Sequence, residues 1–269
     1  MTSVPGLRLR RIILFRFDRN PLVCRSRITL LHRLNPGVPI YGLYGGDAGY
    51  RQVAFRLGGK PVLGLDGFYR SRQSGPWNWK NGDLMAAAWY RDVGYRVAFD
   101  VAHVIEWDLL LLESLDRVYR SIPPEAVGLT ALTPLSAVGD DWVWMQQPDN
   151  RRQWEELLAY ARGKWAYDKE PYACLGPGPC FGRAFLAQYA AIEPPDLCND
   201  ELRLPLFAQI LDFPIFDTGL RRSWYSREED RFFNSTAVSI DPDVIMEEWA
   251  KPDGRRAFHP VREVFGGRQ

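Results

Sequence analysis

The chain alternates between two kinds of hydrophobic pattern. Short, dense apolar runs predict β-strands, and longer segments with apolar residues every three or four positions predict amphipathic helices. The expected strands lie at residues 11–18, 38–44, 61–65, 101–106 and 127–132. The expected helices lie at residues 21–34, 84–92, 109–116, 150–167, 199–211 and 241–249. Glycine and proline occur in two further segments, which predicts an irregular aromatic loop at 68–79 and a rigid turn at 175–180.

This alternation predicts an α/β fold with a Rossmann-like, mostly parallel sheet flanked by helices. We expect a single domain over residues 1–269, because a chain of 269 residues can share one core and no linker or repeat interrupts it. Residues 1–10 are expected to form a flexible N-terminal arm. Residues 11–132 then form a first half, and residues 133–269 form a second half with the C-terminal tail.

Composition narrows the class of protein. Hydrophobic residues make up 46% of the chain and charged residues 25%, which excludes disordered and fibrous proteins. The net charge of +1 gives no general attraction to nucleic acid. No apolar stretch is long enough to span a membrane, and no signal peptide is evident, so we expect a cytoplasmic location, with peripheral attachment to the inner membrane face left open. The four cysteines lack zinc-site spacing and are expected to be buried free thiols: Cys24, Cys174, Cys180 and Cys198.

Two carboxylates one residue apart mark the end of the apolar run that begins at Val101. A strand this apolar is expected to be buried on both faces, so Glu106 and Asp108 belong at its exit. In open α/β sheets ligands bind beyond the carboxyl ends of the strands, and Mg²⁺ or Mn²⁺ prefer carboxylate and phosphate oxygens. The pattern therefore suggests a metal-phosphate site. The alternative is a polar strand end followed by a helix whose first turn favours acids.

Three further features follow in order along the chain. Gly82 opens a predicted helix before the carboxylate pair, Asn199-Asp200-Glu201 open another helix about ninety residues after it, and His259 lies near the end. With Glu106-Trp107-Asp108, this order resembles glycosyltransferases of the GT-A fold, over residues 12–261. Those enzymes bind a metal and a sugar nucleotide with an Asp-x-Asp motif, in which Glu106 here replaces the first aspartate.

The resemblance implies a role for each of these residues. Asp108 would be the direct metal ligand, with Glu106 in support and His259 completing the metal shell. Either Asp200 or Glu201 would be the catalytic base, and the residues leave the choice between them open. Each has an ordinary structural alternative, since acids in a first helical turn act as caps and a lone histidine often packs in a core.

Nucleotide contacts are expected from residues at strand ends and at the glycine-led helix. Trp107, Trp77 and Trp79 offer flat apolar surfaces for a base or a sugar, although core packing explains most of the ten tryptophans. The expected nucleotide-contacting residues are Phe17, Asp18, Arg19, Asp66, Gly82, Asp83, Glu106 and Trp107. Turn formation is the structural alternative at the strand ends.

These expectations combine into one function. The chain is expected to be a metal-dependent glycosyltransferase that uses Mn²⁺ or Mg²⁺ and moves a sugar from a nucleotide diphosphate donor to a hydroxyl acceptor. The acceptor is a carbohydrate, a lipid-linked molecule or a small molecule, and residues 11–132 and 133–269 would bind the nucleotide and the acceptor. One alternative is a nucleotidyltransferase, which should carry a glycine-rich loop that Asp18-Arg-Asn-Pro lacks. The other is a catalytically silent nucleotide-sugar-binding protein of the same fold.

Overall fold

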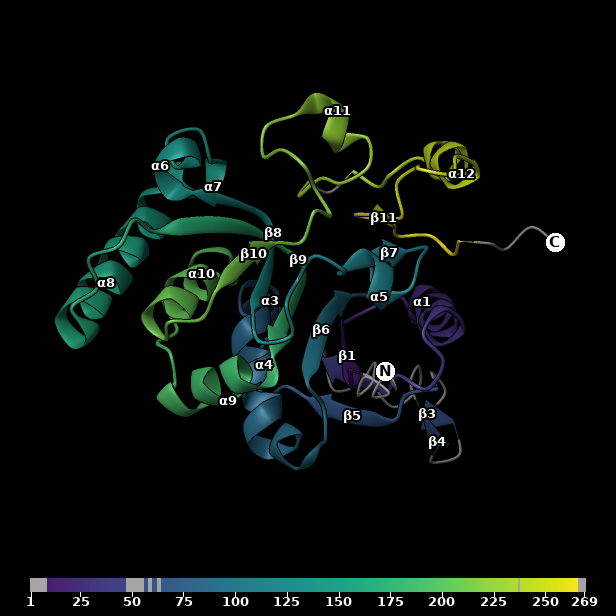
Figure 1. Ribbon diagram of the computed structural model, residues 1–269, viewed down its shortest axis with the longest axis horizontal. Coiled ribbons are helices and arrows are strands. Elements are labelled where there is room, and N and C mark those ends of the chain that lie inside the picture. Colours follow the sequence, from purple (N-terminus) through teal and green to yellow (C-terminus); the bar gives the residue numbers. More distant parts are fainter. Residues whose placement is uncertain (1–8, 47–55, 58–59, 62–63, 237, 266–269) are drawn as a thin grey trace, which may run out of the picture.

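The computed structural model describes residues 9–46, 56–57, 60–61, 64–236 and 238–265, and these form a central sheet covered by helices (Figure 1). Within this part, seven strands run in the order β10-β8-β9-β6-β1-β2-β5. Their bounds are β1 (Arg11–Phe17), β2 (Ile40–Tyr44), β5 (Gly67–Arg70), β6 (Val101–Glu106), β8 (Val127–Pro134), β9 (Tyr172–Gly182) and β10 (Ile215–Asp217).

The sheet is mostly parallel. β1 pairs in parallel with β2 and β6, β2 with β5, and β8 with β10, whereas β9 runs antiparallel to both β6 and β8. The predicted α/β fold is therefore confirmed. All six residues of β6 are buried, as expected for a strand covered on both faces.

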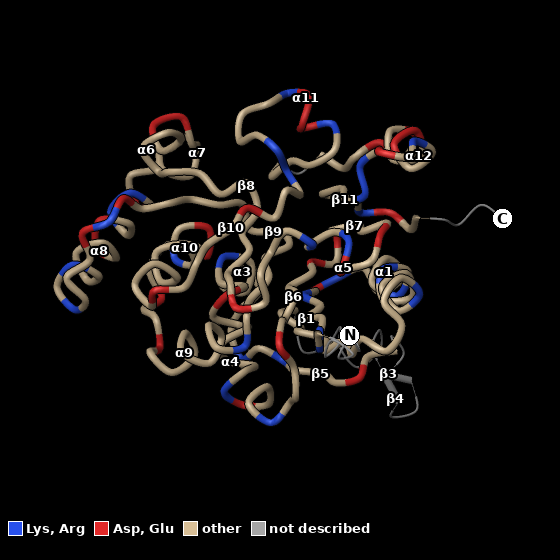
Figure 2. Tube along the Cα trace, in the orientation of Figure 1, with Lys and Arg blue, Asp and Glu red and all other residues tan. Residues whose placement is uncertain are grey.

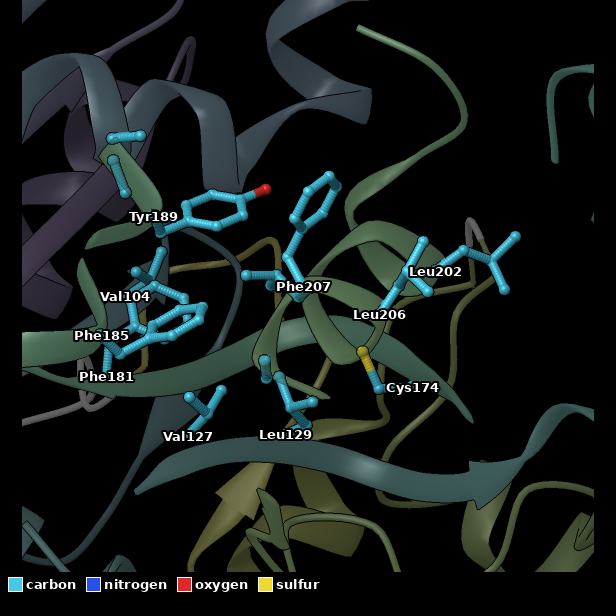
Figure 3. Packing of buried hydrophobic residues seen from close by; sticks show 14 of the residues in the cluster. Val104, Val127, Leu129, Cys174, Phe181, Phe185, Tyr189, Leu202, Leu206 and Phe207 are labelled. Atoms are coloured by element: carbon cyan, nitrogen blue, oxygen red, sulfur yellow. The ribbon is translucent and has the colours of Figure 1, made fainter. Parts of the chain in front are cut away.

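Two layers of helices cover the sheet. The principal helices are α1 (Pro21–Leu34), α4 (Gly82–Asp92), α8 (Pro148–Trp165), α9 (Arg183–Ile192), α10 (Asp200–Ile210) and α12 (Pro242–Ala250). On one face, side chains of β6, β8 and β9 pack against α9 and α10, with Phe181, Phe185 and Phe207 in the contact (Figure 3). On the other face, Ile28 and Leu31 of α1 pack against β1 and β2.

A third, smaller core fixes the C-terminal segment beside the end of β6. Here β7 (Leu110–Leu111) pairs antiparallel with β11 (Ala257–Phe258), and α12 packs on this pair through Ile245 (Figure 1). Because β7 begins two residues after Asp108 and β11 ends one residue before His259, this pairing places His259 beside the end of β6. A contact across about 150 residues of sequence is thus set by two short strands.

Several expected elements differ from those found. Residues 62 and 63 of the expected strand 61–65 lie outside the described residues, and the strand that joins the sheet is β5, which begins one residue after Asp66. The expected loop 68–79 contains most of β5 and most of α3 (Gly75–Lys80), where the Ser74 hydroxyl accepts a hydrogen bond from the backbone N–H of Trp77.

Two other expectations were wrong because strand pairing decides the structure of the segment. Residues 109–116 form β7 and the start of α5 (Leu115–Val118), because pairing with β11 outweighs the helical spacing of the leucines. Residues 175–180 are not a turn but the middle of β9, where shifts in register accommodate the glycines and prolines. The remaining short elements are β3 (Arg56–Leu57), β4 (Lys60–Pro61), η1 (Gly94–Arg96), α6 (Leu135–Val138), α7 (Val143–Gln146) and α11 (Arg227–Asp230).

The bulk expectations can be compared with the structure directly. All four cysteines are free and buried, as predicted. No helix among the described residues is long and apolar enough to cross a membrane. Of the expected N-terminal arm, residues 1–8 lie outside the described part, and Arg10 forms an ion pair with Asp100. Basic and acidic residues are interspersed along α8 (Figure 2).

Candidate active site at the strand ends

A large cleft of about 1270 Å³ opens at the carboxyl ends of β1 and β6. Its walls come from both expected halves of the chain, and nine of the residues predicted for the site lie in them. These are Phe17, Asp18, Arg19, Glu106, Trp107, Asp108, Asp200, Glu201 and His259. The rule that ligands bind beyond the carboxyl ends of parallel strands thus located the cleft correctly.

Asp108 and His259 face each other in one wall of this cleft. His259 Nε2 lies 3.6 Å from Asp108 Oδ1, and His259 Nδ1 lies 2.7 Å from the backbone oxygen of Asn234. A carbonyl oxygen only accepts, so Nδ1 carries a proton and donates it there. Nε2 faces the carboxylate: with a proton it makes the ring a cation beside Asp108, and without one it offers a lone pair to a metal ion.

The charge state of Asp108 follows from its neighbours. Burial alone raises the pKa of this carboxyl, but the polar contact and charge of His259, followed by the charge of Arg262, outweigh burial and bring the pKa below its usual value. Arg262 Nε lies 3.5 Å from Asp108 Oδ2. Asp108 is consequently ionised at neutral pH, in the form that binds cations.

Arg16 connects the carboxylates on the floor of the cleft. Its Nη1 lies 3.7 Å from Glu106 Oε1 and 3.5 Å from Asp200 Oδ2, and its Nη2 donates to the backbone oxygen of Trp79 at 3.3 Å. Burial lowers the pKa of this guanidinium, but the charges of Glu106, Asp200 and Asp108 outweigh burial and raise it. One cation therefore acts on the whole acidic group.

Asp200 and Glu201 begin α10 with different hydrogen bonds. Asp200 Oδ2 accepts from the backbone N–H of Gly82 at 3.1 Å. Both oxygens of Glu201 accept, Oε1 from Gly176 N at 2.8 Å and Oε2 from Asn199 Nδ2 at 3.0 Å. Glu201 is held from two sides, while Asp200 is held through one oxygen.

Burial shifts both of these acids towards neutrality. It raises the pKa of Asp200 to about 7, although the charge of Arg16 opposes the shift. It raises the pKa of Glu201 to about 8, and the charge of Asp200 adds to the effect. Acids with pKa values near neutral pH can exchange protons in catalysis, which a simple helix cap does not require.

Gly82 and Asp83 begin α4 behind the cleft and do not line it. A Cβ on Gly82 would lie 1.6 Å from Arg16 Nη1, so a side chain there would displace the guanidinium. Asp83 forms a fully buried ion pair with Arg203 at 2.6 Å and also accepts a hydrogen bond from Tyr189. These two residues support the site from behind, in contrast to their expected contact with a nucleotide.

The other expected nucleotide contacts divide into two groups. Asp18 and Arg19 form an ion pair at 2.6 Å at the mouth of the cleft, and Trp107 lines its wall half-buried. The ring of Phe17 packs among Phe15, Tyr44 and Phe68 in the core.

Asp66 lies outside the cleft. It accepts a hydrogen bond from Ile40 N at 2.8 Å. Because Asp66 precedes β5 rather than ending a strand, it is found at the opposite edge of the sheet from the cleft.

Three side-chain oxygens in the cleft are buried and accept no hydrogen bond from a described residue: Asn78 Oδ1, Glu106 Oε1 and Asn199 Oδ1. The orientation of Asn78 is fixed, because its Nδ2 lies within 3.1 Å of the backbone oxygens of Gly45, Gln73 and Ser74. Glu106 uses its other oxygen to accept from Gly178 N at 3.0 Å. An unpaired buried acceptor costs about 1–3 kcal/mol, which a ligand with hydroxyl donors recovers.

Sequence reasoning missed several residues of this cleft. Arg16 sits within a strand pattern, so its contact with Asp200 across 184 positions has no local signal. Asn78 falls in a segment expected to be irregular. Trp142 and Trp144 also line the cleft. Their alternation in a polar segment is a local signal from which this part of the cleft could have been predicted.

The donor set can be compared with the needs of a divalent cation. Among the described residues, no three His, Cys, Asp or Glu side chains converge as a metal-binding group. Asp108 and His259 face each other, and the Nδ1 hydrogen bond to Asn234 fixes the orientation of the imidazole, as hydrogen bonds do for metal-binding histidines. Mg²⁺ and Mn²⁺ commonly take one or two protein ligands together with phosphate oxygens and waters. The pair therefore fits a cation that a phosphorylated ligand completes.

No protein-family model matches the chain, and no curated protein matches its sequence. Among solved structures, mouse xyloside xylosyltransferase 1 in its apo form matches 78% of this chain and 84% of its own, at 11% identity and a TM-score of 0.39. The galactosyltransferase LgtC, in complex with donor and acceptor sugar analogues, matches over 82% and 74%, at 12% identity and a TM-score of 0.41. Both matches cover most of this chain at low sequence identity.

Proposed function

We propose that this protein is a glycosyltransferase that moves a sugar from a nucleotide diphosphate to a hydroxyl acceptor. The observation that carries the proposal is the set of buried oxygens of Asn78, Glu106 and Asn199 that accept no hydrogen bond from the described residues, in the same cleft as the Asp108–His259 pair. Acceptors of this kind suit a ligand rich in hydroxyl donors. An ionised carboxylate beside an imidazole suits a cation and a diphosphate.

Asp200 is the base in this proposal. Its Oδ2 accepts a hydrogen bond from Gly82 N and lies near Arg16, which fixes the carboxyl group, while Oδ1 accepts no hydrogen bond from the described residues. Both oxygens of Glu201 are already engaged. Asp200 Oδ1 would therefore accept the proton of the acceptor hydroxyl, and Glu201 would hold the start of α10 in position.

Asp108 and His259 would hold a Mn²⁺ or Mg²⁺ ion. The ion, when bound, offsets the negative charge that develops on the departing diphosphate. Arg262, 3.5 Å from Asp108, supplies a second positive charge at the same wall. Asp108 remains ionised through neutral pH because its pKa lies below the usual value.

A thermal-shift experiment tests this proposal. Purified full-length protein is heated with each of a panel of nucleoside diphosphates, with and without Mn²⁺. We expect one nucleotide to raise Tm by about 5 °C or more, with Mn²⁺, at a concentration about one hundred times its Kd. Asp108→Asn should lose the Mn²⁺-dependent part of this shift.

Asp149→Asn is the matched control. Asp149 is an exposed acid on α8 outside the cleft, so its loss removes the same charge without touching the site. It should keep the full shift. The proposal is wrong if no nucleotide raises Tm in the presence of Mn²⁺.

A further inference from the structure

The wall of the cleft formed by the second half of the chain is built from aromatic rings. Trp142 and Trp144 lie at the start of α7, and Trp224 and Tyr225 lie before α11; all four line the cleft. The ring centroids of Trp142 and Trp144 are 5.6 Å apart, and those of Trp142 and Trp224 are 5.4 Å apart. We call these four residues the aromatic wall.

The aromatic wall is fixed in place by contacts between two separate segments. Trp142 and Trp224 meet edge to face at an interplanar angle of 81°. The Tyr225 hydroxyl donates to the backbone oxygen of Val138 at 2.9 Å, which ties the segment before α11 to α6. The buried Arg221 donates to the backbone oxygens of Ser223 and Trp224, at 2.6 Å each. The rings are thus held before any ligand binds, which lowers the entropy cost of binding.

Polar side chains alternate with these rings along the same wall. Asp141, Gln147 and Asn150 line the cleft beside the two tryptophans of α7. The side chains of Asp141 and Gln147 are exposed and form no hydrogen bond with a described residue. A sugar ring presents a flat face of C–H groups and an edge of hydroxyls, which matches indole faces flanked by amides and a carboxylate. A lipid chain would favour an uninterrupted apolar surface instead.

The size of the cleft leaves room for a second substrate. Its volume of about 1270 Å³ exceeds the range of about 300–1,000 Å³ that is typical for a pocket with one small ligand. The three buried oxygens of Asn78, Glu106 and Asn199 and the Asp108–His259 pair occupy the side formed by α3, the end of β6, the start of α10 and the end of β11. The aromatic wall is the side formed by α7 and the segment before α11.

We propose that the aromatic wall binds the acceptor and that the acceptor is a glycan, stacked on Trp144 and Trp224 with its hydroxyls on Asp141 and Gln147. This rests on the proposed function, because it assigns the second substrate of the same cleft. It selects a carbohydrate from the three acceptor classes that the sequence left open.

Saturation-transfer NMR on the full-length protein tests the assignment. The probes are lactose, maltose and cellobiose, with octanoate as the probe for an apolar chain. We expect transfer to the C–H protons of at least one disaccharide in the unmodified protein. Binding should weaken about tenfold or more in Trp144→Ala and in Trp224→Ala, because truncation of a contacting tryptophan typically costs more than 1 kcal/mol.

Two further variants control for lost folding. Trp224→Phe keeps an aromatic face and should recover part of the binding, whereas loss of folding would not depend on the aromatic ring in this way. Trp249→Ala removes a partly exposed indole on α12 outside the cleft and should bind as the unmodified protein does.

Disaccharide binding and the nucleotide shift together decide the assignment. It is overturned if no disaccharide binds, if binding survives both alanine variants, or if octanoate alone binds at these tryptophans. Nucleotide thermal shifts are measured on the same samples: a nucleotide shift without disaccharide binding rejects the acceptor assignment alone. Disaccharide binding that depends on the tryptophans, without any nucleotide shift, supports the wall and rejects the proposed function.

Discussion

Two neighbouring groups of buried charged side chains in this protein differ in how completely their charges are paired. Asp83 and Arg203 form a sealed pair: both side chains are fully buried, and Arg203 reaches both oxygens of Asp83 and the side chain of Asn81. Arg16 stands between Glu106 and Asp200 at 3.5 Å or more. This second group, the open cluster of Arg16, Glu106 and Asp200, lines the cleft.

The completeness of pairing separates a group that supports the fold from a group that is available for chemistry. A buried charge that is fully paired stabilises one arrangement of α4 and α10 and leaves nothing for a ligand to bind. In the open cluster, Glu106 Oε1 has no hydrogen-bond partner among the described residues, and burial raises the pKa of Asp200 to about 7. Incomplete pairing keeps acceptors and an exchangeable proton available at the cleft.

Breaking the sealed pair should have the largest effect on stability. We expect Arg203→Met to lower the free energy of unfolding by about 3–5 kcal/mol, because it leaves Asp83 charged and buried. Arg16→Met is the matched variant in the open cluster. Arg16→Met should lower the free energy of unfolding by less, because Asp200 has a pKa near 7 and Glu106 a raised pKa, so that both carboxylates take up protons readily. Urea denaturation at pH 7 measures both, and equal losses would contradict the distinction.

Removing the base should affect turnover instead of stability. We expect Asp200→Asn to lower kcat by about 10²–10⁴-fold, the usual contribution of a positioned base. The assay is release of nucleoside diphosphate from the nucleotide sugar that gives the largest thermal shift. In the unmodified protein kcat/KM should rise as the pH passes about 7, because the base must lose its proton, and the variant should lose this rise.

Glu201→Gln is the comparison for this variant. Both oxygens of Glu201 are engaged by Gly176 and Asn199, so the substitution should lower kcat less than Asp200→Asn does. A larger loss in Glu201→Gln would transfer the role of base to Glu201. Unchanged thermal shifts with nucleotide in both variants would show that binding is intact.

The strand-end residues could be predicted because their signals are local. Glu106 and Asp108 follow a run of buried residues, and the rule for parallel sheets then places them at the cleft. His259 lies at the same place because β11, which directly precedes it, pairs with β7, and no local pattern encodes that pairing.

The errors arose where a distant partner decides the role of a residue. Asp83 looked available for a ligand in the sequence, but Arg203, 120 positions later, seals it. Arg16 looked like an ordinary strand residue, although it holds the open cluster together. Asp66 appeared to end a strand and instead precedes β5. For Asp83 and Arg16 the hydrophobic pattern predicted the element correctly or nearly so, while the partner of the charge depended on the tertiary fold.

The smallest expected effect comes from a substitution that shifts Arg16 without removing any charge. It tests whether the open cluster depends on the position of this guanidinium. A Cβ at residue 82 would lie 1.6 Å from Arg16 Nη1, so Gly82→Ala must displace the guanidinium from Asp200. We expect kcat to fall by about 10- to 100-fold, as a displacement of about 1 Å can cause. Stability should change by no more than about 1 kcal/mol, because alanine favours the helix by a similar amount.

Gly163→Ala is the control for this last variant. Gly163 lies in α8, where an added Cβ meets no atom within 4 Å, so the substitution gains helix propensity without any clash. It should raise the free energy of unfolding by about 0.5–1 kcal/mol and leave kcat unchanged. If Gly82→Ala behaved in the same way, Arg16 would not need its position beside Asp200. The open cluster would then be, like the sealed pair behind it, a structural contact.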